Sequence, residues 1–166
     1  MDNKKNKWLS SDQIYQKISA FCAYQERCHA EVRSKLIQLG CFGDDLEQQI
    51  IRLIDENFLN EERFAILYAQ SKLRQKHWGK IKIELQLKAK RISEYCRKKA
   101  LNEIDDLEYQ NILKMIIINK WNATAYNSEY ERKIKTQQYA YRKGFEPEII
   151  QTIFDNLYHN DSFSLE

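Results

Sequence analysis

Thiol and imidazole groups are the side chains of this sequence best suited to metal binding or nucleophilic chemistry. Cys22, Cys28 and His29 lie within eight residues of one another, but the CxxC and HxxxH spacings that hold zinc do not occur. Free cysteine usually packs as a small apolar side chain. We therefore predict reduced, buried structural cysteines at four positions: Cys22, Cys28, Cys41 and Cys96. No metal and no cofactor are expected.

Two pairs of acidic residues are the next candidates for chemistry, as a general acid and base. Glu61-Glu62 follows Asn60, and Asp105-Asp106 precedes an apolar stretch. Both pairs stand where a helix begins, and carboxylates there favour the positive end of the helix dipole. We read them as helix caps and assign no catalytic residue. An enzyme whose site is assembled from distant residues is the alternative that remains.

Charge is distributed unevenly along the chain. The net charge of the 166 residues is only +3, but residues 72–99 hold eleven basic and two acidic residues. That segment carries +9 and the remainder −6. Such a field attracts nucleic acid or an acidic protein surface, whereas isolated charges are simply solvated. Trp78, within the segment, could stack on a base, anchor a protein interface or fix the fifth helix to its neighbours.

The elements that must position these residues are helices. Four glycines and one proline are too few for the turns of sandwiches and barrels. Apolar residues recur at helical spacing, and the fifth helix is expected to turn Ile81 and Leu85 inward. Nine helices are predicted, beginning near Ser10, Val32, Asp44, Asn60, Gly79, Ser93, Asp106, Ser128 and Pro147.

Nine helices suggest three repeats of three. The stretch Glu31–Leu36 aligns with Lys80–Leu85 at a shift of 49 residues. We predict an all-α fold, an elongated and curved array of three tandem three-helix repeats. The expected division is an N-terminal tail (1–10), three repeats (11–59, 60–104 and 105–158) and a C-terminal tail (159–166). Because no signal peptide or membrane span is evident, a cytoplasmic location is expected.

Four motifs resemble the RecX family of regulatory proteins. Asn57–Ala65 is similar to its "G-Y-L-D-D-x-R-F-A" signature, and Glu31–Leu36 followed by Gly40 is similar to its "E-L-R-x-K-L … G" segment. Trp78–Leu85 resembles "G-x-x-R-I-x-x-E-L", and Tyr141–Phe145 resembles "L-x-R-R-G-F". The motifs come in the family's order and extend roughly from residue 22 to residue 157.

The resemblance implies a regulatory protein without enzymatic activity. RecX proteins bind the RecA recombinase filament and inhibit its ATPase and strand-exchange activities in recombination, DNA repair and the SOS response. Some also contact DNA. The implied partners are therefore the RecA filament and, weakly, DNA, with no membrane, and a monomer is expected. A nucleic-acid-binding helical protein that uses residues 72–99 without RecA is the competing hypothesis.

Basic side chains on the first two repeats are the residues that we expect to bind the partner. The second repeat supplies most of them and the first repeat two. They are Arg33, Lys35, Arg74, Lys76, Lys80, Lys82, Lys88, Lys90 and Arg91. Arg63, which matches the signature, is as well explained by a structural ion pair.

Overall fold

The computed structural model describes residues 9–123, 125 and 127–159, and these residues form nine α-helices and no strand. The all-helical prediction is confirmed. The helices are α1 (Ser11–Tyr24), α2 (His29–Gln38), α3 (Gly43–Asp55), α4 (Glu61–Lys76), α5 (Lys80–Ala89), α6 (Glu94–Asn102), α7 (Asp106–Ala123), α8 (Glu129–Lys143) and α9 (Pro147–His159).

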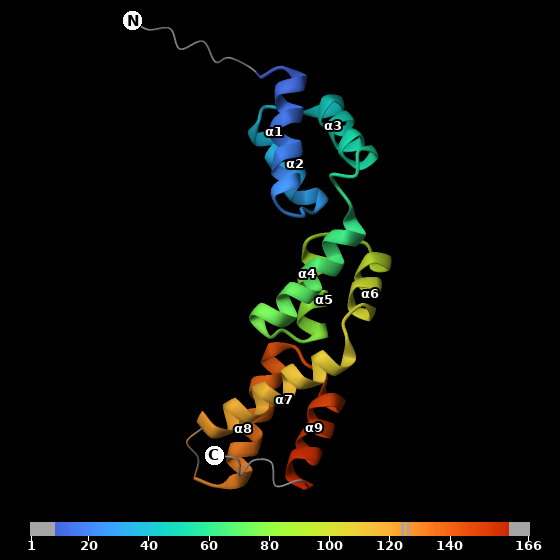
Figure 1. Cartoon of the computed structure of the whole chain (residues 1–166). Helices are drawn as coiled ribbons and strands as arrows, with labels where there is room; N and C mark the ends of the chain where they lie inside the picture. Colours follow the sequence, from blue (N-terminus) through green and yellow to red (C-terminus); the bar gives the residue numbers. More distant parts are fainter. Residues whose placement is uncertain (1–8, 124, 126, 160–166) are drawn as a thin grey trace, which may run out of the picture.

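The helices form three groups stacked along one axis, so the molecule is an elongated column (Figure 1). Unit 1 comprises α1–α3, unit 2 comprises α4–α6 and unit 3 comprises α7–α9. We keep the boundaries 59/60 and 104/105 as proposals, because each falls in a short connection between two helices. Most of the two expected tails, residues 1–8 and 160–166, lies outside the described residues.

Helix starts follow the capping residues that the sequence offers. Ser10 and Gln13 form a reciprocal capping box at the start of α1. The side chains of Asn60, Ser93 and Ser128 each accept a hydrogen bond from the backbone N–H three residues later. These polar caps satisfy N–H groups that have no partner within the helix, which fixes where each of these four helices begins.

Apolar side chains form two separate cores. One lies wholly in unit 1, between its three helices, and includes Ile18, Leu36 and Leu53. The other is continuous through units 2 and 3, and includes Leu87 and Leu113. Units 2 and 3 therefore behave as one packed body, and unit 1 adds to it mainly through Cys28 and Ala30.

One turn geometry ends α2, α5 and α8. Gly40, Arg91 and Gly144 all have positive φ angles, of 84°, 61° and 91°. The next residue in each case donates a backbone hydrogen bond back to the last turn: Cys41 to Leu36, Ile92 to Leu87 and Phe145 to Ala140. This is the Schellman type of helix end. The three turns fix the register of the repeats.

The register shows that the expected shift of 49 residues was wrong. Helix α2 and helix α5 match at a shift of 51 residues. Val32 and Leu36 therefore correspond to Ile83 and Leu87, which are buried. The prediction that Ile81 and Leu85 face inward was also wrong, since they are 44% and 60% exposed.

Two glycines allow close contact where unit 2 meets unit 3. We call this junction the second seam, since the junction between units 1 and 2 comes before it along the chain. A Cβ on Gly79 would lie 2.1 Å from the carbonyl oxygen of Gly144, and a Cβ on Gly144 would lie 2.3 Å from the Cβ of Lys82. The N–H groups of Gly79 and Ile81 donate to the carbonyls of Lys143 (2.9 Å) and Gly144 (3.1 Å). The end of α8 therefore caps the start of α5.

We predict that Gly79→Ala destabilises the protein. Gly79 has a φ of −76°, which alanine tolerates, so the whole cost is steric. Because the obstacle is backbone, the expected loss in the free energy of unfolding is about 3 kcal/mol. Urea denaturation measures it.

Gly43→Ala is the matched control for this substitution. The space around Gly43 is open, and only its φ of +58° penalises alanine, by about 1 kcal/mol. Equal losses for the two variants would contradict the steric explanation of the second seam.

We also predict that Arg91→Gly stabilises the protein, by roughly 0.5–1 kcal/mol, because glycine adopts a positive φ without strain. Arg91→Ala is the control, since it removes the guanidinium and keeps the strain. Thermal unfolding should show a gain for Arg91→Gly alone. A similar gain for Arg91→Ala would assign the effect to charge instead.

Candidate functional site

Four of the nine expected binding residues form ion pairs within the protein. Arg33 pairs with Glu47, and Arg74 forms a two-pronged pair with Glu108 at 2.7 and 3.0 Å. The other two pairs are Lys80–Asp106 (3.2 Å) and Lys90–Glu31 (2.7 Å). Except for Arg33–Glu47, these pairs join one unit to the next. They therefore contribute to the stacking of the units.

Lys90 and Arg63 are the cations that tie unit 1 to unit 2. Burial works against the charge of Lys90, but the hydrogen bond and attraction of Glu31 raise the pKa of Lys90 above its ordinary value. Arg63 bonds to Glu26 at 2.6 Å and to the side chain and carbonyl of Asn57 at 3.0 Å. The structural explanation of Arg63 is confirmed.

A cleft of about 550 Å³ opens at this junction, which we call the first seam. Both ion pairs border it. Phe64, Leu67 and Tyr68 of α4 supply its apolar wall. The first seam is thus loosely filled, whereas the second seam is closed by backbone contact.

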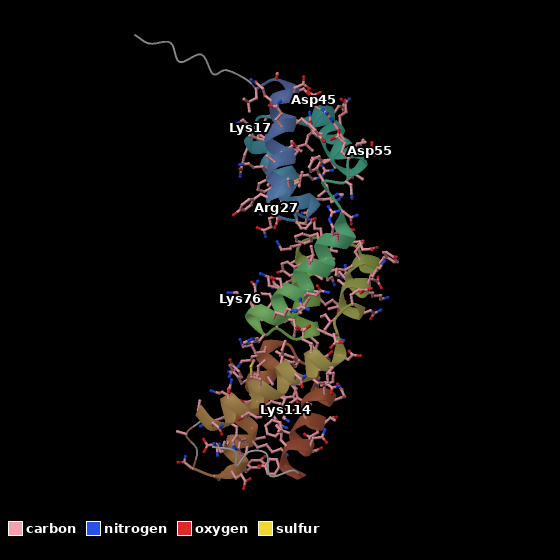
Figure 2. The ribbon with its side chains drawn as sticks, viewed as in Figure 1. Lys17, Arg27, Asp45, Asp55, Lys76 and Lys114 are labelled. Carbon is pink, nitrogen blue, oxygen red and sulfur yellow. The ribbon has the colours of Figure 1, made fainter. Side chains whose placement is uncertain are left out.

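The remaining five expected residues have no ion pair with any acid in the part of the chain that the structure describes: Lys35, Lys76, Lys82, Lys88 and Arg91. Lys35 stands apart, on α2, where its ammonium lies 5.8 Å from the ring centre of Phe21. The other four belong to unit 2. Figure 2 shows Lys76 at the end of α4, level with the second seam.

Cations gather around Trp78 at the second seam. The ammonium groups of Lys82 and Lys72 lie 4.9 and 5.8 Å from the Trp78 ring centre, within the range of a cation–π contact. From unit 3, the ammonium of Lys143 donates to the carbonyl of Lys76 at 3.2 Å. We call five residues the seam cluster: Lys72, Lys76, Trp78, Lys82 and Lys143. The half-buried Trp78 also packs against the shared core, so it is both a structural residue and part of this surface.

The two seams differ at one pair of equivalent positions. In the first seam, Glu31 and Lys90 attract each other. The repeat register places Lys82 at the position of Glu31, and Lys143 at the position of Lys90. The second seam thus carries two cations where the first carries an ion pair. An anionic ligand could be bound where these two positions supply positive charge.

Tyr109 secures the second seam from inside. Its hydroxyl donates to Glu146 and accepts a hydrogen bond from the N–H of Lys80 at 2.9 Å. Burial, together with the bond to Glu146, raises the pKa of Tyr109 far above its ordinary value. The hydroxyl therefore stays protonated and keeps the start of α5 against α7.

Sequence reasoning identified part of the seam cluster. It selected Lys76 and Lys82 but also chose the structural cations described above. It counted Lys72 in the basic segment without selecting it. Lys143 lies outside that segment; it belongs to the Tyr141–Phe145 motif, and the repeat register is what relates it to Lys90.

The four cysteines are free and buried, as predicted. Burial raises the pKa of Cys22 to about 11, so its thiol stays protonated at neutral pH. Across the described residues, no group of three or more His, Cys, Asp or Glu side chains is placed to hold a metal ion. None of the helices described has the length and apolar character needed to cross a membrane.

Comparison with known proteins gives consistent results. Residues 60–101 match the model of the second three-helix domain of RecX, and residues 107–154 match that of the third. The "Regulatory protein RecX" of Pectobacterium atrosepticum is 28% identical over 147 residues, covering 89% of this chain and 88% of the relative. That of Clostridium tetani is 26% identical, covering 97% and 76%.

Solved structures agree with the sequence matches. The crystal structure of RecX from Lactobacillus salivarius superposes with a TM-score of 0.80 at 26% identity, covering 89% of this chain and 96% of that one. A second crystal structure, of a regulatory protein RecX, shares the fold with a TM-score of 0.75 at 19% identity. With more than half of its residues matched by two successive RecX domains, this chain belongs to the RecX family of regulatory proteins.

Proposed function

We propose that this protein binds the RecA recombinase filament on DNA and inhibits its ATPase and strand-exchange activities. Family membership supports the regulatory role, and the RecX motifs point to RecA as the partner. The observation that carries the proposal is the seam cluster, in which Lys72 and Lys82 lie against Trp78 and Lys143 bonds to the carbonyl of Lys76. Four cations on one rigid body form a surface for carboxylates or phosphates.

The elongated shape suggests how binding would inhibit. A column of three stacked units can contact more than one subunit of a helical filament at once (Figure 1). A ligand that bridges subunits opposes any movement between them, and ATP turnover in a filament couples to such movement. The seam cluster lies at the junction of the second and third units, where it would anchor the contact.

Neutralising the seam cluster tests this function. We expect the triple variant Lys72→Gln, Lys76→Gln, Lys82→Gln to bind RecA–DNA filaments about 10-fold more weakly or worse at physiological salt. Its inhibition of the DNA-dependent ATPase should fall in parallel. Co-sedimentation with filaments, with and without RecA, measures the binding.

The matched control removes three cations elsewhere: Lys17→Gln, Lys98→Gln and Lys114→Gln. Lys17 lies in unit 1 and Lys114 in unit 3 (Figure 2), and Lys98 pairs only with Glu94 of its own helix. Full inhibition by a folded seam-cluster variant would sink the proposal. Equal loss of binding to bare DNA and to filaments would favour the nucleic-acid-binding alternative.

A single charge reversal separates binding from stability. Lys82→Glu places a carboxylate near Lys143, as Glu31 stands near Lys90 in the first seam. We expect the variant to be unchanged or more stable by up to about 1 kcal/mol, because opposite charges then occupy the two positions that form an ion pair in the first seam. Its binding to filaments should nevertheless decrease.

Lys88→Glu is the control for this reversal, since Lys88 has no ion pair among the described residues. Urea denaturation of both variants compares their stability, and co-sedimentation measures the filament binding of Lys82→Glu. Destabilisation by Lys82→Glu alone would show that opposite charges at these two positions do not stabilise the second seam.

A further inference from the structure

An apolar stripe on the outer face of α5 has no structural task. Ile81 and Leu85 lie one helical turn apart and are 44% and 60% exposed. The inner face of the same helix is already filled by Ile83 and Leu87, which are fully buried. The stripe is therefore additional to the core and stands in solvent.

The equivalent positions in the other units show that the fold does not require this stripe. The repeat register matches Leu85 with Ser34 in α2 and with Gln138 in α8, both of which are exposed. Ile81 matches the half-buried Ala30 and Ile134. Only the middle unit places a large apolar side chain at the outermost position. Exposed leucine and isoleucine gain from a partner that covers them.

The surroundings of the stripe indicate the chemistry of that partner. Lys82 and Lys88 border it on the same helix and outnumber the one acid there, Glu84. Neither lysine is paired with an acid of the described chain. Through the N–H of Ile81 the stripe adjoins the second seam, so it is continuous with the seam cluster. Apolar side chains flanked by ammonium groups complement apolar side chains flanked by carboxylates.

We propose that the outer face of α5 docks a protein segment of the recombinase filament that carries apolar side chains beside carboxylates. The inference rests on the proposed function and specifies the chemistry of the contact between this protein and the filament. Nucleic acid is the less suitable occupant, because bases stack on aromatic or guanidinium planes and phosphates need only the lysines. Ile81 and Leu85 supply the apolar centre of the contact, and the lysines its charged rim.

The double variant Ile81→Ser, Leu85→Ser tests the stripe. Both side chains are exposed, so the fold should be retained, as circular dichroism and thermal unfolding will verify. We expect its binding to RecA filaments to weaken about 10-fold or more. Because the missing contact is apolar, the weakening should persist in high salt, and binding to bare single-stranded DNA should be unchanged.

The control is Leu107→Ser on α7 of unit 3, where a leucine is 69% exposed on a different helix. It should bind filaments as the unmodified protein does. Unchanged filament binding by the double variant overturns the proposal that the stripe is a docking site, while leaving the proposed function intact. Equal weakening toward bare DNA would make nucleic acid the occupant. If the unmodified protein does not bind filaments, the proposed function fails and the stripe with it.

Discussion

The backbone contact between Gly79 and Gly144 is the constraint on which the candidate surface depends. It brings the end of α8 onto the start of α5, so that carbonyls of unit 3 accept the N–H groups that open a helix of unit 2. The negative end of one helix dipole then meets the positive end of another. This contact fixes the rotation of α5, and with it the position of Lys82 beside Trp78 and the outward direction of Leu85.

Ion pairing divides the cations of the basic segment into two groups that have different functions. A net charge of +9 over residues 72–99 gives the impression of one continuous surface, but Arg74, Lys80 and Lys90 are each paired with an acid of a neighbouring unit. The cations that remain for a partner include the seam cluster, Lys88 on the outer face of α5, and Arg91. The pairs between units hold the array together, and the other cations give it an external field.

The sequence was sufficient to predict the helices, but it was insufficient to predict which face of α5 is buried. Caps such as Ser10 and Asn60 are local signals, and they marked helix starts correctly. In α5, apolar residues alternate along Ile81–Leu87, and a helix can turn only half of them inward. The neighbouring unit decides which half, through a contact 65 residues away in sequence. The pairs that hold Lys80 and Lys90 are likewise long-range, so no spacing rule could assign them.

The division of the core has a mechanical consequence. To bend the column at the second seam, a force would have to break backbone hydrogen bonds and expose apolar side chains shared by units 2 and 3. At the first seam it would chiefly stretch Glu26–Arg63 and Glu31–Lys90 beside a cleft that is already open. The protein is therefore a stiff two-unit rod with a compliant joint, and salt, which screens ion pairs, softens the joint more than the rod, whose junction also rests on backbone hydrogen bonds and a shared core.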